Sequence, residues 1–336
     1  MNENEYMSYK YYLKVLSSIL LSSVVITGCN NRTENAVTQN VSQDDVEKIV
    51  IGFQKSHLNL ITLKTEESLI QKHFPKTQIE WKEFPAGPQM LEALSAGSVD
   101  IGSVGNTPPI FAQSGNKELR YVAYEQSHPQ TQAIIIADNN DQIQNLADLK
   151  GKRIALQRGS SAHDLLDKIL QKANLQWSDI TPIWLPPADA RAAFDKKTVD
   201  AWVAWEPFLS VALDTGHAKI LSDSAPFGRS YSFIIANPNF VQKHPQAVNQ
   251  FINASNDAAH WIIKNPDKAL TNYAATIGLD KTITQKIINK RFQPSLIHPI
   301  NQEVLQSQQK IANRFAQEKL IPQKIDVTQV AFNPAS

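Results

Sequence analysis

Residues 93–113 read ALSAGSVDIGSVGNTPPIFAQ, and this stretch decides the fold class. It runs from a helical segment through a glycine turn into a short strand, 99–105, and then into a second helix start. Asn106 and Thr107 are good N-cap residues, and the two prolines behind them fit a first helical turn. A helix that begins directly after a strand presents free N–H groups and a partial positive charge. We therefore expect either an ordinary capped helix start here or an anion-binding site.

The alternation of strands and helices continues on both sides of this stretch. Further strands are expected at 48–53, 78–84, 120–126, 132–137, 153–157, 179–185, 199–205 and 231–237. Helical patterns separate most of them, and residues 238–336 are mostly helical. Such alternation predicts an α/β fold with parallel-rich sheets.

An internal echo indicates two lobes. Residues 193–205, AFDKKTVDAWVAW, align without a gap with residues 93–105, so that Asp200 matches Asp100. Chance similarity of two helix–turn–strand units is the alternative. Ligands of open α/β sheets bind beyond the carboxyl ends of the strands, so two facing lobes predict a cleft between them. We expect lobe 1 to comprise 48–134 plus 234–336, lobe 2 to comprise 135–233, and the chain to cross near 132–137 and 231–236.

The composition excludes several function classes. The 336 residues allow two domains, and 42% hydrophobic with 19% charged residues is typical of a globular protein. A net charge of +1 gives no reason to expect nucleic acid. The histidines show no metal-ligand spacing, and neither a phosphate loop nor a nucleophile elbow occurs. We therefore expect a protein that is not an enzyme, with no catalytic residue, metal or cofactor.

The N-terminus predicts export. Lys10 and Lys14 precede the apolar run 15–28, which is too short for a comfortable membrane span, so residues 1–28 indicate a signal peptide. The only cysteine, Cys29, ends ITGC, which resembles a bacterial lipoprotein cleavage box and implies a lipid on Cys29. The polar residues 29–47 are expected to form a flexible tether. A plain cleavable signal or a short anchor is the alternative.

Polar residues follow the expected strands where a cleft would open. They include Gln54, the Asn106–Thr107 pair, the Ser160–Ser161 pair, and Trp205 with Glu206. Amides, hydroxyls and helix N-termini beside an aromatic wall suit a small anion with an apolar part. Each residue has a structural alternative, because serines often only cap helices and tryptophans usually belong to the core.

Three long motifs resemble the aliphatic sulfonate-binding proteins of bacterial ABC importers. They are WKEFPAGPQMLEALSAGSVDIGSVGNTPPIFAQ (81–113), LKGKRIALQRGSSAHDLL (149–166), and PPADARAAF (186–194) with VDAWVAWEPF (199–208). The resemblance implies a two-lobed periplasmic binding protein fold. It also implies a monomer that delivers an alkanesulfonate, as a sulfur source, to a permease with its ATPase. Because Asn30 follows Cys29, a lipid would favour the outer membrane.

The resemblance also implies a set of ligand-binding residues: Gln54, Asn106, Thr107, Ser160, Ser161, His163, Trp205, Glu206 and Ser232. The sequence departs from the family at residues 56–59, where a glycine-serine turn is usual, and at Asn106, where aspartate is common. Taurine, a sulfate ester or nitrate is therefore an alternative ligand. An enzyme on the same fold, as in thiamine pyrimidine synthesis, is a further alternative.

Overall fold

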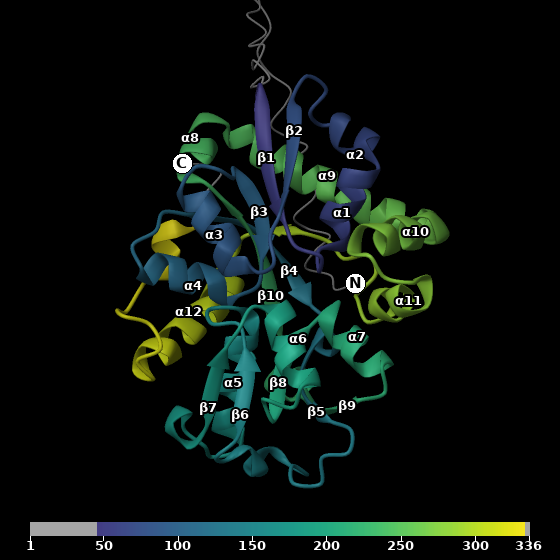
Figure 1. Ribbon diagram of the computed structural model, residues 1–336. Coiled ribbons are helices and arrows are strands. Elements are labelled where there is room, and N and C mark those ends of the chain that lie inside the picture. The colour runs from purple at the N-terminus through teal and green to yellow at the C-terminus, as the bar shows by residue number, and fades with distance from the viewer. Residues whose placement is uncertain (1–45, 333–336) are drawn as a thin grey trace, which may run out of the picture. The chain divides into compact units, whose positions relative to one another are not determined.

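The computed structural model describes residues 46–332, and Figure 1 shows their arrangement. The expected signal peptide, Cys29 and the tether up to residue 45 lie outside the described residues.

Lobe 1 is built on a six-stranded sheet with the order β11-β4-β10-β3-β1-β2. The strands β1 and β2 are parallel, as are β1 and β3, whereas β10 runs antiparallel to both of its neighbours, β3 and β4. The strand bounds are β1 Lys48–Phe53, β2 Gln78–Glu83, β3 Ile101–Val104, β4 Arg120–Ser127, β10 Ser230–Ala236 and β11 His298–Pro299.

Helices cover both faces of this sheet (Figure 1). Along β1, Ile49, Ile51 and Phe53 point to one face while Val50 packs on the other, as the two-residue period of a strand requires. One face is covered by α1 (Leu58–Thr65), α2 (Glu67–Gln71), α8 (Pro238–Lys243), α9 (Pro245–Lys264), α10 (Pro266–Ile277) and α11 (Lys281–Asn289). The other is covered by α3 (Gly87–Ser95), α4 (Thr107–Ser114) and α12 (Gln302–Gln317).

Lobe 2 is built on a five-stranded sheet with the order β7-β6-β8-β5-β9. Within it, the interior strand β5 places Ile134 and Ile136 on one face and Ala133 and Ile135 on the other. The strand bounds are β5 Gln132–Ala137, β6 Arg153–Leu156, β7 Thr181–Trp184, β8 Ala201–Trp205 and β9 Ala218–Asp223. The helix α5 (Ser161–Lys172) packs on the first face, and α6 (Pro187–Asp195) and α7 (Phe208–Asp214) pack on the second.

The two lobes share one plan, as the internal echo predicts. In each, a parallel trio of strands is extended by two antiparallel strands, β10 and β4 in lobe 1 and β5 and β9 in lobe 2. The matched residues also make the same contact. The carboxylate of Asp100 accepts from the N–H of Val50 at 2.7 Å, and that of Asp200 accepts from the N–H of Arg153 at 2.8 Å.

Two features differ from the sequence expectation. The sheets are mixed rather than parallel-rich, because the strands beside each crossing run antiparallel to their neighbours. The crossings also come earlier than expected. The strand β5 lies wholly in the sheet of lobe 2 and β10 wholly in that of lobe 1, so the chain crosses at 128–131 and 224–229. Polar turns separate apolar strands there, whereas the sequence boundaries at 134 and 233 cut through them.

Candidate binding pocket between the lobes

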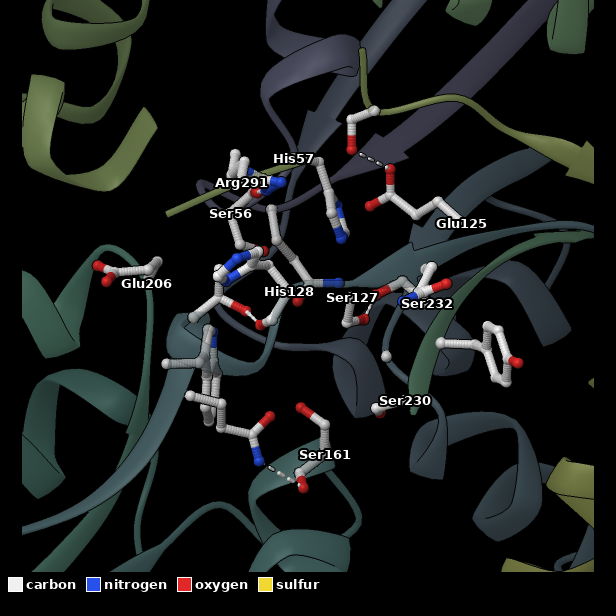
Figure 2. Close-up of a pocket in the computed structure, with 18 of the residues that line it drawn as sticks. Ser56, His57, Glu125, Ser127, His128, Ser161, Glu206, Ser230, Ser232 and Arg291 are labelled. Carbon is white, nitrogen blue, oxygen red and sulfur yellow. Dashed lines mark hydrogen bonds between the residues drawn. The ribbon is translucent and has the colours of Figure 1, made fainter. Parts of the chain in front are cut away.

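A pocket lies where the two lobes face each other, at the carboxyl ends of β1, β3, β6 and β8 (Figure 2). Lobe 1 lines it with the segments that follow β1 and β3, with the adjoining ends of β4 and β10, and with the loop behind α11. Lobe 2 lines it with Gln132, the start of α5 and the end of β8. The lining residues that carry the argument below are Gln54, His57, Glu125, Ser160, Ser161, Trp205, Glu206, Ser232, Arg291 and Ser295.

Several helix starts meet at this pocket. Gly87 opens α3, Gly105 and Pro108 flank the start of α4, and Ser160 is the N-cap of α5. At α5 the first-turn N–H groups have no intrahelical partner and carry a partial positive charge, whereas the prolines in the first turns of α3 and α4 have no N–H to offer. At Gly105 an added Cβ would lie 3.0 Å from the Cβ of Ser161. A glycine at this position therefore lets the α5 start of lobe 2 come close to lobe 1.

Serine hydroxyls supply further donors. The hydroxyls of Ser127 and Ser232 lie 3.1 Å apart, and that of Ser160 donates to the carbonyl of Gln157 at 2.7 Å. The Ser161 side chain makes no hydrogen bond to the part of the chain that the structure describes, while its carbonyl accepts from Gln132 at 2.8 Å. Ser161 therefore presents an unoccupied hydroxyl to the pocket.

Arg291 supplies the positive charge. It lies just behind α11, and its guanidinium donates to the carbonyl of Ser56. Its Nε is buried and has no hydrogen-bond partner among the described residues. An unpartnered cationic donor at the pocket wall is a group that an anionic ligand can satisfy.

The neighbouring His57 is neutral at physiological pH. Burial and the charge of Arg291 lower the pKa of His57 to about 3. Its Nε2 lies 3.2 Å from the hydroxyl of Ser103, and its buried Nδ1 has no partner among the described residues. When Ser103 donates to Nε2, Nδ1 carries the ring proton and can donate to a ligand.

Two carboxylates also line the pocket. Glu206 is buried and is held by Lys290, whose Nζ lies 2.8 Å from its Oε1, and by the hydroxyl of Ser210 at 2.9 Å. Glu125 accepts from the hydroxyl of Ser295 at 3.2 Å, and Figure 2 shows its other oxygen turned toward His57. Burial raises the pKa of Glu125, against the opposing charge of Arg291. Glu206 is thus neutralised by a lysine, and Glu125 faces the pocket beside an arginine.

Comparison with known proteins identifies the family. The model of NMT1/THI5-like proteins matches residues 79–269. The aliphatic sulfonates-binding protein of Escherichia coli K12 is 38% identical over 293 residues, which are 87% of this chain and 91% of the relative. The chain belongs to the aliphatic sulfonate-binding protein family. The fold agrees with two solved structures of family members.

The first of these structures is the alkanesulfonate-binding protein SsuA from Xanthomonas axonopodis pv. citri, bound to MOPS. It has a TM-score of 0.81 and 35% identity, covering 85% of this chain and 98% of that one. The second is the periplasmic aliphatic sulphonate binding protein SsuA from Escherichia coli, with a TM-score of 0.77 and 38% identity, covering 84% and 97%. The two-lobed periplasmic binding protein fold expected from the sequence is confirmed.

In this member of the aliphatic sulfonate-binding family, six of the nine expected site residues line the pocket. They are Gln54, Ser160, Ser161, Trp205, Glu206 and Ser232. Trp205 lies at the end of β8, while Trp202, three residues earlier, is buried in the core of lobe 2. The strand period places these two tryptophans on opposite faces, as expected.

Asn106 and Thr107 do not line the pocket. The side-chain amide of Asn106 donates to Asp164 in α5 at 2.8 Å, and its Oδ1 accepts from the Thr107 hydroxyl at 3.0 Å. The backbone carbonyl of Asn106 accepts from the side chain of Gln308. Both residues are buried. An aspartate at position 106 could not donate to Asp164, so the amide here fits a contact between the lobes.

His163 is also turned away from the pocket. Its ring lies between Phe111 and Phe315 of lobe 1 and Trp177 and Trp184 of lobe 2, with centroids 4.9–5.4 Å away. Burial, followed by the charge of Arg158, lowers the pKa of His163 to about 3. A neutral ring in an aromatic cluster joins the two lobes without reaching the pocket.

Beside this cluster, an ionic cluster joins the same two lobes. Arg314 of α12 donates to Asp164 and to Asp167 of α5, and both carboxylates are buried. The indole N–H of Trp177 adds a 2.9 Å hydrogen bond to Asp167. The lobes thus meet on one side through α12 and α5 and on the other through α11 and α7.

Sequence reasoning missed Arg291 and Glu125. Arg291 lies more than 180 residues after Ser103 and follows a helix rather than a strand, so no motif marks it. Glu125 lies two residues before the end of β4, and nothing in the sequence of that strand marks it. Within residues 46–332, no group of three or more His, Cys, Asp or Glu side chains could hold a metal ion. No helix in that range is long and apolar enough to span a bilayer.

Proposed function

We propose that this chain is the extracytoplasmic substrate-binding protein of an ABC importer, and that it captures aliphatic sulfonates and delivers them to a permease. It acts by binding rather than by catalysis. The observation that carries the proposal is the buried, unpartnered Nε of Arg291 beside the neutral His57 and the convergent helix starts. A sulfonate is anionic at physiological pH, so it needs donors and no proton acceptor.

The bound ligand would lie between the lobes. Its three oxygens would accept hydrogen bonds from the Arg291 guanidinium, from the Ser161 hydroxyl and from the N–H groups at the start of α5. Trp205 offers an apolar wall beside them. Closure of the lobes around the anion, through hinges at the two crossings, would exclude water and strengthen these hydrogen bonds.

Placement outside the cytoplasm is part of the proposal. It is supported by the sequence of residues 1–28 and by the periplasmic E. coli relative. A lipid on Cys29 would hold the protein at a membrane, with the outer membrane favoured by Asn30. The protein would act as a monomer, with residues 29–47 as its tether.

Titration calorimetry on the full chain tests the function. Methane-, ethane- and butanesulfonate, sulfate, nitrate and butyrate form the ligand panel, and binding of the sulfonates alone is expected. Arg291→Met should weaken methanesulfonate binding about 10- to 100-fold, as expected for losing a charge-assisted contact. The control Arg153→Met removes an exposed arginine paired with Asp200. Equal binding by Arg291→Met and the unmodified chain would overturn the proposed site.

Glu125 favours one second candidate, an aminosulfonate such as taurine. An ammonium group on the ligand would pair with the pocket-facing carboxylate oxygen. Taurine would then bind more tightly than ethanesulfonate, and Glu125→Gln would remove that difference. If ethanesulfonate binds at least as tightly as taurine, Glu125 balances the charge of Arg291 and does not bind a ligand ammonium group, and this candidate fails.

A further inference from the structure

The ligand pocket adjoins a second hollow on the surface of lobe 1. The two share Gln126, Tyr231, Phe292 and Ser295. Beyond them, the hollow is lined by Tyr124, Arg229, Pro294, Leu296, His298, Glu303 and Val304. We call this second hollow the side groove. Because the shared residues belong to both linings, the two hollows lie side by side, and a ligand tail that leaves the pocket past these residues would enter the side groove.

The chemistry changes along this path. The pocket lining is dominated by hydroxyl, amide and charged groups, whereas the side groove is rich in rings. Tyr124 packs edge-on against Tyr231, with centroids 5.5 Å apart, and its ring is tilted against that of His298 at 5.6 Å. Phe292 leaves 40% of its surface exposed at the junction, with its ring 4.7 Å from that of His128. Such rings favour an apolar or aromatic group on the ligand.

The outer end of the side groove carries no net charge. Arg229 and Glu303 are both well exposed there, and their nearest charged atoms are 3.8 Å apart. A second charge on the far end of the ligand would be attracted by one of these two side chains and repelled by the other. It would therefore add little to the affinity. The groove fits an uncharged tail.

From this adjacency we infer that the preferred substrate is a monosulfonate with a long alkyl or aryl tail, held with its head in the pocket and its tail in the side groove. This inference rests on the proposed function. It places tail recognition on Phe292, Leu296 and Tyr124 of lobe 1, rather than on Trp205 of lobe 2. A longer tail buries more apolar surface, at about a fourfold gain in affinity per fully buried methylene.

Calorimetry with methanesulfonate and octanesulfonate tests the inference on the full chain. The unmodified chain should bind octanesulfonate about tenfold or more tightly than methanesulfonate. Leu296→Ser, which changes a half-buried residue of the side groove, should lower that ratio about threefold or more. Trp205→Ala should lower it less than Leu296→Ser does. Ile263→Ser, at an exposed apolar residue of α9 outside the groove, is the control.

The outcomes separate the two proposals. A ratio that Leu296→Ser leaves unchanged while Trp205→Ala collapses it would place the tail on lobe 2 and overturn the inference. Equal binding of both sulfonates by the unmodified chain would overturn it as well, with sulfonate binding itself intact. Absence of binding to any sulfonate would overturn the proposed function and, with it, this inference.

Discussion

Lys290, just after α11, pairs with Glu206, just after β8, so a lysine of lobe 1 neutralises a buried carboxylate of lobe 2 across the pocket edge. Their charged atoms are 2.8 Å apart, and the Glu206 side chain is only 2% exposed. A buried charge without its partner is costly. This ion pair therefore favours the arrangement in which the two lobes lie close together.

Removing Lys290 should therefore destabilise the protein. Lys290→Met is expected to lower the free energy of unfolding by about 2 kcal/mol or more, because Glu206 keeps only the Ser210 contacts. Lys286→Met provides the matched control, since Lys286 and its partner Asp214 are far more exposed and should contribute about 0.5 kcal/mol. Urea unfolding measures both. Similar losses in the two variants would contradict the burial argument.

Gly105 should limit how closely the lobes approach. Gly105→Ala brings a Cβ to 3.0 Å from that of Ser161, so the start of α5 must move outward. We expect methanesulfonate affinity to fall several-fold and the radius of gyration of the ligand-bound protein to rise in small-angle scattering. Gly115→Ala is the control, because its new Cβ meets only ordinary contacts at 3.4 Å. Unchanged affinity in Gly105→Ala would show that the lobes need not come this close.

Ser160 and Ser161 should separate in their effects. The Ser160 hydroxyl already donates to Gln157, whereas the Ser161 hydroxyl has no partner in the described chain. Ser161→Ala should weaken methanesulfonate binding about tenfold with little change in unfolding free energy. Ser160→Ala should cost about 1 kcal/mol of stability and less affinity. Calorimetry measures the affinities and urea unfolding the stabilities. A larger loss of affinity in Ser160→Ala than in Ser161→Ala would make Ser160 the ligand donor instead of Ser161.

The buried His163 should make stability depend on pH. Its pKa is about 3 in the folded protein and near 6.5 when unfolded, so the unfolded chain binds more protons between these values. Stability is therefore lost as the pH falls below about 6.5, by up to about 1.4 kcal/mol per pH unit from this residue. His163→Phe should reduce the slope between pH 6 and pH 5 by that amount.

The His163→Phe variant keeps an aromatic ring in the cluster, so it separates titration from packing. The control His260→Phe removes a solvent-exposed histidine of α9. Free energies of unfolding from urea titrations at several pH values give the slopes. An unaltered slope in His163→Phe would mean that the ring is protonated in the folded protein.

Local sequence patterns predicted most of the elements, because each strand and helix carries its own periodicity. The expected strand at 48–53 and the helix starting behind Asn106 appear as β1 and α4. The helical pattern of residues 60–74, LITLKTEESLIQKHF, indicates a single helix, whereas the structure has two helices there, α1 and α2, divided at Glu66. At the break, Glu66 accepts hydrogen bonds from Lys268 and Asn272 of α10, and local sequence does not record such a contact.

The pocket was only partly predictable, because local periodicity does not show which side chains meet across the two lobes. Residues that directly follow strands, such as Gln54 and Trp205, reach it because the topology brings strand ends together. The partners of a side chain are set by contacts between the lobes, which local sequence does not record. Asn106 and His163 were expected to contact a ligand, and the structure instead commits them to such contacts. Arg291 reaches the pocket from a distant helix end.

The place of β10 has a consequence for biosynthesis. Lobe 2 is made from one continuous run of chain, whereas the sheet of lobe 1 has β10 inserted between β3 and β4. As the chain emerges N-terminus first, every strand of lobe 2 is available before residue 230 appears. Until then β3 and β4 present unpaired edges, which are sites for aggregation. Lobe 2 can therefore fold early. The strands β3 and β4 of lobe 1 remain without their shared partner until β10, more than a hundred residues later, has been made.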